Sequence, residues 1–485
     1  MRGRMLKGAA AICLALNAAT GDAREAGHAQ PSPMGVSWGV LYGFPSAKSE
    51  AFMPQARALG ASFSRITLYW SQLEPQEGAP RWADLDSWLD QLKTPEEGVL
   101  TLASASPWAT HTKAWVFPSS PATDPARYEA FVRRVVAHAK GRVRYFQGET
   151  EPNNPFFWSG SAGEYAAQQK LFYKAVKQVD PNAAVVLAGS DGLFDPTGAD
   201  PVPGQEADLA FLNRELAGAK GAFDLFDLHL YGNPYTIPAR VEAVRQAMRA
   251  AGTEHPIIVS EYDGPGFFEF HANRRWFASL QGPGATPEAV RALRGKAATL
   301  PAETRMFLNP DDPEMVHRLF LLQSNDLVVR NLLALSSGVL RTGFFDLSHD
   351  TSQADAPNTV LYGTLKLLDH SGDHNDRGLD RELPLAAPFR RLALALAGMS
   401  RATRITLPTY PDVYAFRVER RGRSPLLVAW RRPATLGTES EPLGIAVPWQ
   451  GRVTHGTAID GDATPVASEH SLVLLTVTDR PVLAE

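Results

Sequence analysis

Two glutamates lie two positions apart in the segment RVRYFQGETEPNNPFFW (residues 142–158), where a strand-like run ends. Pro152 removes a backbone donor and favours an extended Glu151, so Glu151 is predicted to lie where the strand leaves its sheet. A second carboxylate, Glu261, comes near the end of another strand-like run, PIIVSEY. Two carboxylates that face one another can cleave a glycosidic bond, because one protonates the leaving oxygen while the other attacks the anomeric carbon.

Polar residues of two other runs are predicted to serve this pair. Arg65 lies in SFSRITLYW, and FDLHLYG places His229 and Tyr231 on one face near its end. Arg65 and Tyr231 would hold Glu261 ionised, because an opposite charge and a hydrogen bond both stabilise a carboxylate. For His229 taken alone, a structural role and a role in the site are equally compatible with the sequence.

The neighbourhood of Glu151 suggests further supporting residues. By strand alternation Gln147, Glu149 and Glu151 share one face, so Glu149 is predicted to lie one layer deeper, in a buried supporting contact. Glu151 would have to keep a proton in order to act as the acid. Aromatic side chains close to strand ends could stack on sugar rings, with ordinary loop packing as the alternative for each. These aromatic residues are Trp70, Trp108, Phe156, Phe157 and Trp158.

Strand-like runs alternate with helical patterns from residue 34 to about residue 400. Eight strands that alternate with helices predict an α/β fold, a (β/α)8 TIM barrel, with an open doubly wound sheet as the competitor. Counted along the chain, Glu151 ends strand 4 and Glu261 ends strand 7. The runs are 35–43, 62–70, 98–107, 142–149, 183–190, 226–232, 256–262 and 338–347. Insertions at 264–311 and 348–386 would lie at the C-terminal mouth, where such barrels build their sites.

The ends of the chain have a different character. After residue 402 the hydrophobic period becomes two, in short runs separated by Gly, Pro and Asp, which predicts a small antiparallel β-sandwich. The first residues have a basic start, an apolar middle and a small-residue end, which predicts a signal peptide and a secreted or periplasmic protein. The predicted domains are a signal peptide (1–23), a linker (24–33), a catalytic barrel (34–400) and the β-sandwich (402–485).

Composition argues against several kinds of site. The single cysteine, Cys13, lies in the predicted signal peptide, so the mature chain would have no disulfide, cysteine nucleophile or thiolate metal site. The formal net charge of −4 comes without a basic stripe, so no nucleic-acid partner is expected. No cofactor, metal or membrane span is expected either. A cluster in DHSGDHNDRGLD fits neither an EF-hand nor a zinc motif and is interpreted as a solvated loop; it holds His370, Asp373, His374 and Asp376.

The motifs together resemble the clan A glycoside hydrolases, and among them family 39 and its relatives. The resemblance rests on ETEPNN, HLY and VSEY, preceded by RITLYWSQLEPQEG and RWADLDSWL, and covers most of residues 34–400. The later VYAFRV and PLLVAW resemble the small β-domain often attached to such barrels. The resemblance implies that Glu151 is the acid/base, that Glu261 is the nucleophile, and that the reaction retains configuration through a covalent glycosyl-enzyme.

One position departs from the clan pattern. Thr150 occupies the place of an Asn that bonds the 2-hydroxyl of the reacting sugar, a contact that strengthens in the transition state. Thr150 itself could still donate, Asn153 or Asn154 could take over, the substrate could differ at C2, or turnover could be slow.

The expected protein is therefore a secreted hydrolase of O-glycosidic bonds in an oligo- or polysaccharide, with bacterial exopolysaccharides among the candidates. A barrel that binds polysaccharide without cleaving it is the alternative: Thr150 favours it, and the two retained glutamates oppose it. A serine esterase is a further alternative, because GVSWG (35–39) matches G-x-S-x-G, although an apolar run follows it where a helix is required. The sequence leaves the sugar, its linkage, endo or exo action and the oligomeric state open.

Overall fold

The computed structural model describes residues 30–38, 52–190, 194–198, 204–281, 284–349, 355–362, 366–369 and 381–485. Residues Pro31–Glu485 form one compact unit. The predicted signal peptide, most of the predicted linker and the cluster from His370 to Asp376 lie outside the described residues.

Eight strands close into a barrel in sequence order, as their alternation with helices predicts. Neighbouring strands are parallel, and β1 pairs with β8 to complete the ring. The closed ring excludes the open doubly wound sheet. The strands are β1 (Met34–Trp38), β2 (Phe63–Tyr69), β3 (Glu97–Ala103), β4 (Tyr145–Gly148), β5 (Ala184–Leu187), β6 (Leu225–Asp227), β7 (Ile257–Tyr262) and β8 (Thr342–Phe345).

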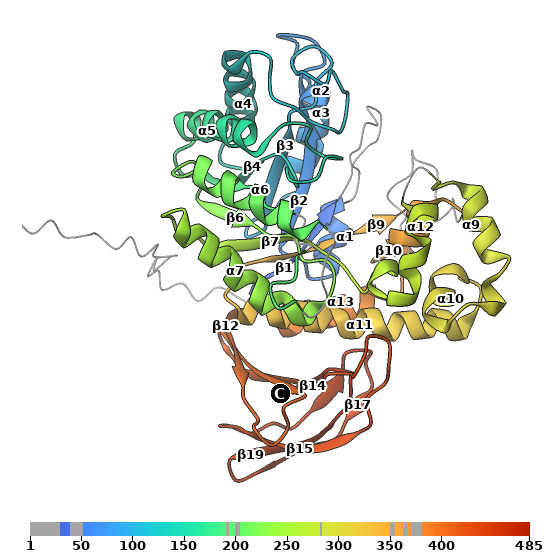
Figure 1. Cartoon of the computed structure of the whole chain (residues 1–485). Coiled ribbons are helices and arrows are strands. Elements are labelled where there is room, and N and C mark those ends of the chain that lie inside the picture. Colours follow the sequence, from blue (N-terminus) through green and yellow to red (C-terminus); the bar gives the residue numbers. More distant parts are fainter. Residues whose placement is uncertain are drawn as a thin grey trace, which may run out of the picture. The chain divides into compact units, whose positions relative to one another are not determined.

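Helices surround the barrel strands (Figure 1). Their starts follow the local sequence: Asp124 accepts hydrogen bonds from the first backbone N–H groups of α4, with Pro125 in its first turn, and Ser161 and Glu164 form a capping box at α5. The helices of this layer are α1 (Phe52–Ala58), α2 (Trp70–Leu73), α3 (Ala83–Leu89), α4 (Pro125–Ala139), α5 (Ala162–Val179), α6 (Gln205–Gly218), η1 (Pro234–Thr236), α7 (Ile237–Ala250), α11 (Pro313–Ser336) and α13 (Ala386–Ala395).

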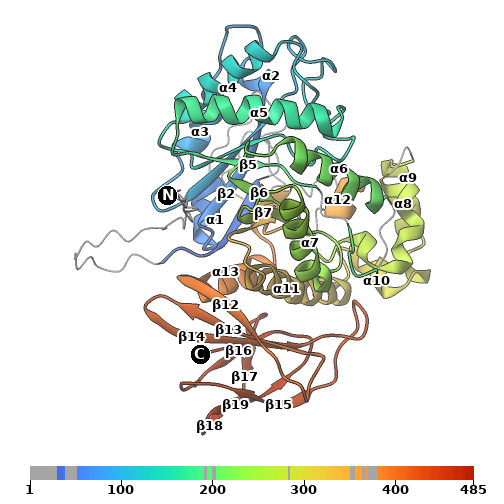
Figure 2. The same cartoon turned by 60° about the vertical axis from the view of Figure 1, so that its left-hand side comes forward.

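The insertions after β7 and β8 pack against each other (Figures 1 and 2). Phe270, Phe307 and Val360 are buried in the apolar core that they share. The first contains η2 (Phe267–Glu269), η3 (His271–Trp276), α8 (Phe277–Leu280), α9 (Pro287–Arg294), η4 (Ala297–Thr299) and α10 (Ala302–Leu308). The second contains β9 (Ser348–His349), α12 (Pro357–Tyr362), β10 (Leu368–Asp369) and β11 (Arg381–Glu382), whose strands form a small sheet.

The C-terminal part is a two-layered antiparallel β-structure (Figure 2), as the period of two predicts. Alternate residues such as Val413, Ala415, Ile445 and Val473 are buried together between the two sheets. One sheet has the order β12-β13-β14-β20-β16-β17 and the other β15-β19-β18. The strands are β12 (Met399–Ile405), β13 (Val413–Arg420), β14 (Arg423–Arg431), β15 (Leu443–Pro448), β16 (Gly456–Ala458), β17 (Ala463–Thr464), β18 (Val466–Glu469), β19 (Leu472–Val477) and β20 (Val482–Ala484).

The interior of the barrel is built in layers that place the polar residues. An apolar layer has one buried side chain from each of six strands, namely Phe63, Val99, Tyr145, Val186, Leu225 and Ile258. Strand alternation puts the residue two positions further along on the same face. In five of these strands that residue is polar and buried, namely Arg65, Thr101, Gln147, Asp227 and Ser260. The strands therefore carry a polar layer towards their C-terminal ends, above an apolar floor.

Candidate active site

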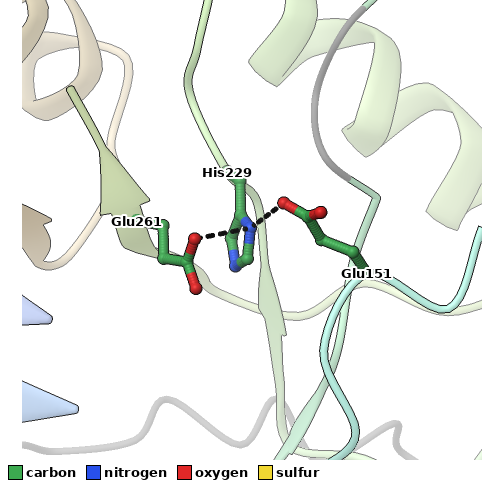
Figure 3. A group of neighbouring side chains, drawn as sticks. All are labelled: Glu151, His229 and Glu261. Atoms are coloured by element: carbon green, nitrogen blue, oxygen red, sulfur yellow. Dashed lines mark hydrogen bonds and ion pairs between the residues drawn. The ribbon is translucent and has the colours of Figure 1, made fainter. Parts of the chain in front are cut away.

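The two predicted carboxylates meet at the C-terminal mouth of the barrel. Glu151 follows β4 and Glu261 lies near the end of β7, and both are largely buried, with 6% and 9% of their surface exposed. One oxygen of each carboxylate and one ring nitrogen of His229 all lie within 4.8 Å of one another. The ring of His229 lies between the two carboxylates (Figure 3). The chain thus brings together residues from the ends of β4, β6 and β7.

His229 connects these carboxylates to the polar layer below. Its Nδ1 lies 2.7 Å from Oε1 of Glu151 and 3.5 Å from Oε2 of Glu261, and its Nε2 lies 3.3 Å from Oδ2 of Asp227. Burial alone would lower the pKa of His229, but the charges of Glu261 and Asp227 raise it well above its ordinary value. The surrounding carboxylates therefore favour the protonated form of His229.

Glu261 has the partners that the sequence predicts for an ionised nucleophile. Nη1 of Arg65 donates to its Oε1, and the hydroxyl of Tyr231 donates to its Oε2 over 2.8 Å. Burial raises the pKa of Glu261, yet the positive charges of His229 and Arg65 and the Tyr231 hydrogen bond outweigh burial and lower it overall. Glu261 is consequently a carboxylate at neutral pH.

Arg65 is the centre of the polar layer. Its Nε donates to Oγ1 of Thr101 over 2.9 Å and to Oε1 of Gln147 over 3.0 Å, and its Nη2 donates to Oγ1 of Thr150 over 2.9 Å. Nε2 of Gln147 donates in turn to Oδ2 of Asp227 over 2.7 Å. Because a buried guanidinium with these partners has little freedom to move, Glu261 is held in one position.

Asp227 anchors the other side of this layer. Ser260 donates to it twice, from its backbone N over 2.8 Å and from its hydroxyl. Burial raises the pKa of Asp227, but His229 counteracts this and brings it down to about 2. The sequence analysis did not single out Asp227, although it lies two positions before His229 in the same strand-like run and alternation could have revealed it.

Thr150, Asn153 and Asn154 each form a hydrogen bond with another residue of the protein. Oγ1 of Thr150 accepts a hydrogen bond from Arg65 and so belongs to the polar layer. Nδ2 of Asn153 donates to Oδ1 of Asp208 over 3.0 Å, and Oδ1 of Asn154 accepts from the backbone of Phe156 over 3.0 Å. Asn153 therefore bonds helix α6, and Asn154 bonds its own loop.

Glu149 is buried, as predicted, but it is not on the interior face. The backbone has φ +69° at Glu149 and φ +38° at Glu151, so the alternation ends at Gly148 and Glu151 is not extended as Pro152 led us to expect. Oε1 of Glu149 accepts from the backbone of Ser104 over 2.9 Å and from Gln168 of α5 over 3.2 Å. Left-handed residues that are not glycine persist where the surrounding structure over-determines them, commonly at functional sites.

Three predicted stacking residues belong to the packing of the scaffold. Trp70 is fully buried and stacks on Phe131 at 4.7 Å between ring centroids. Trp158 is 2% exposed and packs edge-on against Tyr165. Trp108 packs edge-on against Trp70, and its Nε1 donates to the backbone O of Glu74 over 3.0 Å. Because Trp70 and Trp158 are buried, their rings have no free face for a sugar. For these two residues the alternative interpretation, ordinary packing, is the correct one.

A charged group on the β7–β8 side was missed by the sequence analysis. Nζ of Lys366 lies 3.4 Å from Oδ1 of Asp346, which directly follows β8. Burial raises the pKa of Asp263 to about 7, with Lys366 opposing the rise. Burial also raises the pKa of Tyr362 to about 12, helped by the charges of Asp263 and Glu151. Asp263 follows Glu261 by two residues and could have been noticed, whereas the distant Lys366 and Tyr362 carried no motif.

Glu151, His229 and Glu261 also have the atoms to hold a metal ion. Their atoms, however, already bond one another, and Glu261 is further bonded by Arg65 and Tyr231. The fixed charge of Arg65 and the imidazolium of His229 oppose a second cation there. The arrangement fits proton transfer and nucleophilic attack better than metal ligation.

The competing serine motif lacks the geometry of a nucleophile elbow. Ser37 lies within β1 and is 1% exposed, whereas a nucleophilic serine requires a sharp turn between a strand and a helix. Over the parts of the chain that the structure describes, every helix is too short or too polar to cross a membrane.

Comparison with known proteins gives a result at the level of the fold. No family model matches the chain, and no curated protein matches it. Among solved structures, it is similar to a family 39 glycoside hydrolase from Bacteroides cellulosilyticus WH2, with 14% identity, a TM-score of 0.60, and 94% of this chain and 81% of that chain covered. A GH39 β-xylosidase from Caulobacter crescentus matches with 16% identity, a TM-score of 0.52 and coverage of 95% and 97%.

A third match comes from another family. The catalytic domain of GH30 xylanase C from Talaromyces cellulolyticus is 12% identical, with a TM-score of 0.55 and coverage of 94% and 96%. At these identities the likeness concerns the fold. The chain has the fold of the clan A glycoside hydrolases, with family 39 among the families that share it.

Proposed function

We propose that this protein is a retaining glycoside hydrolase, with Glu151 as acid/base and Glu261 as nucleophile. The observation that carries the proposal is the placement of two buried carboxylates beside one imidazolium, at the ends of β4 and β7, within 4.8 Å of one another. Among the residues that the structure describes, Arg65 bonds Glu261 and not Glu151, so the two carboxylates have different environments. Different environments are what separate an acid from a nucleophile.

In the first step Glu261 attacks the anomeric carbon and the bond to the leaving oxygen breaks. Arg65 and Tyr231 keep Glu261 anionic until the attack, and its charge is neutralised as the covalent ester forms. The proton for the leaving oxygen comes from the pair of Glu151 and His229, whose Oε1 and Nδ1 lie 2.7 Å apart.

In the second step the same groups act in reverse. Glu151, now a carboxylate, takes a proton from a water molecule that attacks the anomeric carbon, and Glu261 leaves as a carboxylate. The rising negative charge on Glu261 is again stabilised by Arg65 and Tyr231. Each residue is thus used in both directions, as microscopic reversibility requires.

The carboxylate spacing supports retention over inversion. Retaining enzymes have carboxyl groups about 5–5.5 Å apart, whereas inverting enzymes leave about 6.5–9.5 Å for a water molecule. Here one oxygen of Glu151 and one of Glu261 lie within 4.8 Å. Retention is tested by NMR of the freshly released product: the anomer of the substrate should appear first, and initial appearance of the opposite anomer contradicts this mechanism.

The substrate is proposed to be an oligo- or polysaccharide. Solved structures of this fold include a xylanase, a β-xylosidase and a family 51 α-L-arabinofuranosidase. We propose a panel that includes xylan, arabinan, mixed-linkage β-glucan and bacterial exopolysaccharides, assayed with the wild type, Glu151→Gln and Glu261→Gln. Release of sugar by the wild type and its loss in Glu261→Gln support the assignment, whereas full activity of Glu261→Gln refutes it.

Thr150 favours a second candidate, a barrel that binds polysaccharide and cleaves it slowly or not at all. Its hydroxyl accepts from Arg65, where an Asn amide would reach the 2-hydroxyl of the sugar. The same panel separates the two candidates, because a binding barrel retains polysaccharide in native gels without releasing reducing sugar.

We also propose that the chain is secreted after cleavage behind Ala23. The support is the basic, apolar and small-residue order of its first 23 residues. Mass spectrometry of protein recovered from the periplasm or medium should give a chain that begins at Arg24, and an intact Met1 would contradict this.

A further inference from the structure

Exposed aromatic rings gather on the loops that follow β3 and β4, beside Glu151. Trp115 is 60% exposed and Phe156 is 67% exposed, far more than most large apolar side chains of the chain. Phe117 and Phe157 pack against each other with 4.7 Å between their ring centroids, and Phe156 lies 4.9 Å from Phe157; Trp115 is two residues before Phe117 in the same loop. These four rings, Trp115, Phe117, Phe156 and Phe157, are called the aromatic platform below.

The platform is built onto the strands of the site. Phe117 packs on Tyr69, the last residue of β2, at 5.0 Å between ring centroids. The hydroxyl of Ser71, which follows β2, donates to the backbone O of Trp115. The backbone of Ser119 donates to the backbone O of Phe157 over 2.7 Å, which joins the two loops. Exposed rings held by such contacts are preformed, so little conformational entropy is lost when a ligand binds them.

The platform is continuous with the acid/base glutamate. The backbone of Asn154 donates to the backbone O of Glu151 over 2.9 Å, and Oδ1 of Asn154 accepts from the backbone of Phe156 over 3.0 Å. Two tight turns therefore join Glu151 to Phe156, and five residues can span at most about 17 Å. In the proposed reaction Glu151 protonates the leaving oxygen, so its own loop lies on the leaving-group side.

We propose that the aromatic platform binds the leaving-group portion of a polysaccharide chain, so that the enzyme acts on a polymer rather than on a terminal sugar with a small aglycone. This inference rests on the proposed function and extends it to chain length. Sugar rings present C–H faces that pack on aromatic rings, and an exposed apolar patch beside a polar site is typical of ligand-binding surfaces. The rings of the platform carry no charge, so we expect a neutral or weakly charged polymer.

The test compares Trp115→Ala/Phe156→Ala with Phe277→Ala as the matched control. Phe277 is 52% exposed and lies in the insertion after β7, away in the sequence from the loops that carry the aromatic platform. All three side chains are exposed, so folding should be unaffected, and circular dichroism checks this. In the Glu261→Gln background, native gels that contain soluble xylan, mixed-linkage β-glucan or a bacterial exopolysaccharide report binding.

The expected result is retardation of the Glu261→Gln protein by at least one of these polymers. The double substitution should weaken that binding about tenfold, while Phe277→Ala leaves it unchanged. In the enzyme that retains Glu261, the double substitution should lower kcat/KM for the polymer by a similar factor. With a 4-nitrophenyl glycoside, a substrate with a small leaving group, kcat/KM should stay within about twofold. Equal losses on both substrates, or no loss on the polymer, overturn the proposal.

The two proposals fail in different ways. If the enzyme cleaves the aryl glycoside but no polymer retards it, the platform proposal is overturned and the hydrolase proposal stands. If polymer binding depends on the platform but nothing is cleaved, the platform proposal stands and the hydrolase proposal fails. Unchanged polysaccharide binding in the double variant points to a different partner for the platform and overturns the inference.

Discussion

The hydroxyl of Tyr231 donates a hydrogen bond of 2.8 Å to Oε2 of Glu261. The bond joins the loop after β6 to the carboxylate on β7. The position of Tyr231 therefore affects the ionisation of Glu261. It stabilises the ionised form of Glu261 and lowers its pKa, together with the charges of His229 and Arg65.

Tyr231→Phe should move the acidic limb of the pH profile upward. Without the hydroxyl the pKa of Glu261 rises, so the nucleophile becomes ionised only at higher pH. A hydrogen bond to a charged group contributes about 1.5–3 kcal/mol, which corresponds to about one to two pH units. We expect the acidic limb of kcat/KM to shift up by about one unit, so that activity is lost on the acidic side first. A profile displaced to lower pH would contradict this account of Glu261.

Substitution of the acid/base should depend on the leaving group. Glu151→Gln should lower kcat/KM by about 10²–10⁴ for a sugar or alkyl leaving group, which needs a proton. A 2,4-dinitrophenyl glycoside needs little protonation, so its glycosylation step should fall far less. Stopped-flow release of dinitrophenol measures that step directly. Equal losses for both leaving groups, with the fold intact, would assign Glu151 another role.

Thr150→Val should disturb the site through Arg65. The substitution keeps the shape of the side chain but removes one acceptor of Nη2 of Arg65, and a hydrogen bond to a charged group contributes about 1.5–3 kcal/mol. We expect kcat to fall about tenfold and thermal stability to drop measurably. Thr150→Ser keeps the hydroxyl and is the matched control, with kcat within about threefold of the wild type. Similar values for both variants would show that the hydroxyl is dispensable.

Glu149→Gln should stabilise the protein in a pH-dependent way. Burial raises the pKa of Glu149 to about 7, although bonds from Ser104 and Gln168 oppose the rise. Below pH 4 both folded and unfolded chains carry the proton, so Glu149 has no effect there. Between about pH 4.5 and 7 the unfolded chain ionises first, which destabilises the fold progressively, by about 3 kcal/mol above pH 7.

The amide variant removes this loss and keeps the acceptor for the backbone of Ser104. Urea unfolding at pH 5 and pH 8 measures the difference, which should be larger at pH 8. A gain that is the same at both pH values, or a loss at pH 8, would mean that Glu149 is stabilised as a carboxylate.

Sequence reasoning worked where it depended on periodicity. The alternation of strands and helices gave the ring from β1 to β8, and the change to period two gave the C-terminal sheets. Sequence reasoning also made Arg65 and Tyr231 partners of Glu261, and strand alternation put His229 and Tyr231 on one face. These results follow because backbone geometry fixes side-chain direction wherever the strand continues.

Sequence reasoning failed where the backbone leaves the strand. The left-handed conformations at Glu149 and Glu151 turn Glu149 towards α5 and Glu151 into the site, and no local sequence pattern predicts them. The burial of Trp70 depends on Phe131, which lies far away in sequence, and that of Trp158 depends on how α5 packs Tyr165 against it. Lys366 approaches Asp346 only through the path of the chain after β8, which sequence patterns do not specify.

The contacts of Arg65 also bear on how a protein of this kind can change its specificity. A single guanidinium bonds Thr101, Gln147, Thr150 and Glu261, so a substitution at any of these positions is felt by all the others. Natural drift at those sites is therefore expected to be slow, whereas the loops that carry the aromatic rings can vary without disturbing the chemistry. A mutant library aimed at new substrates should keep Arg65 and its four partners and randomise the loops that carry the aromatic platform.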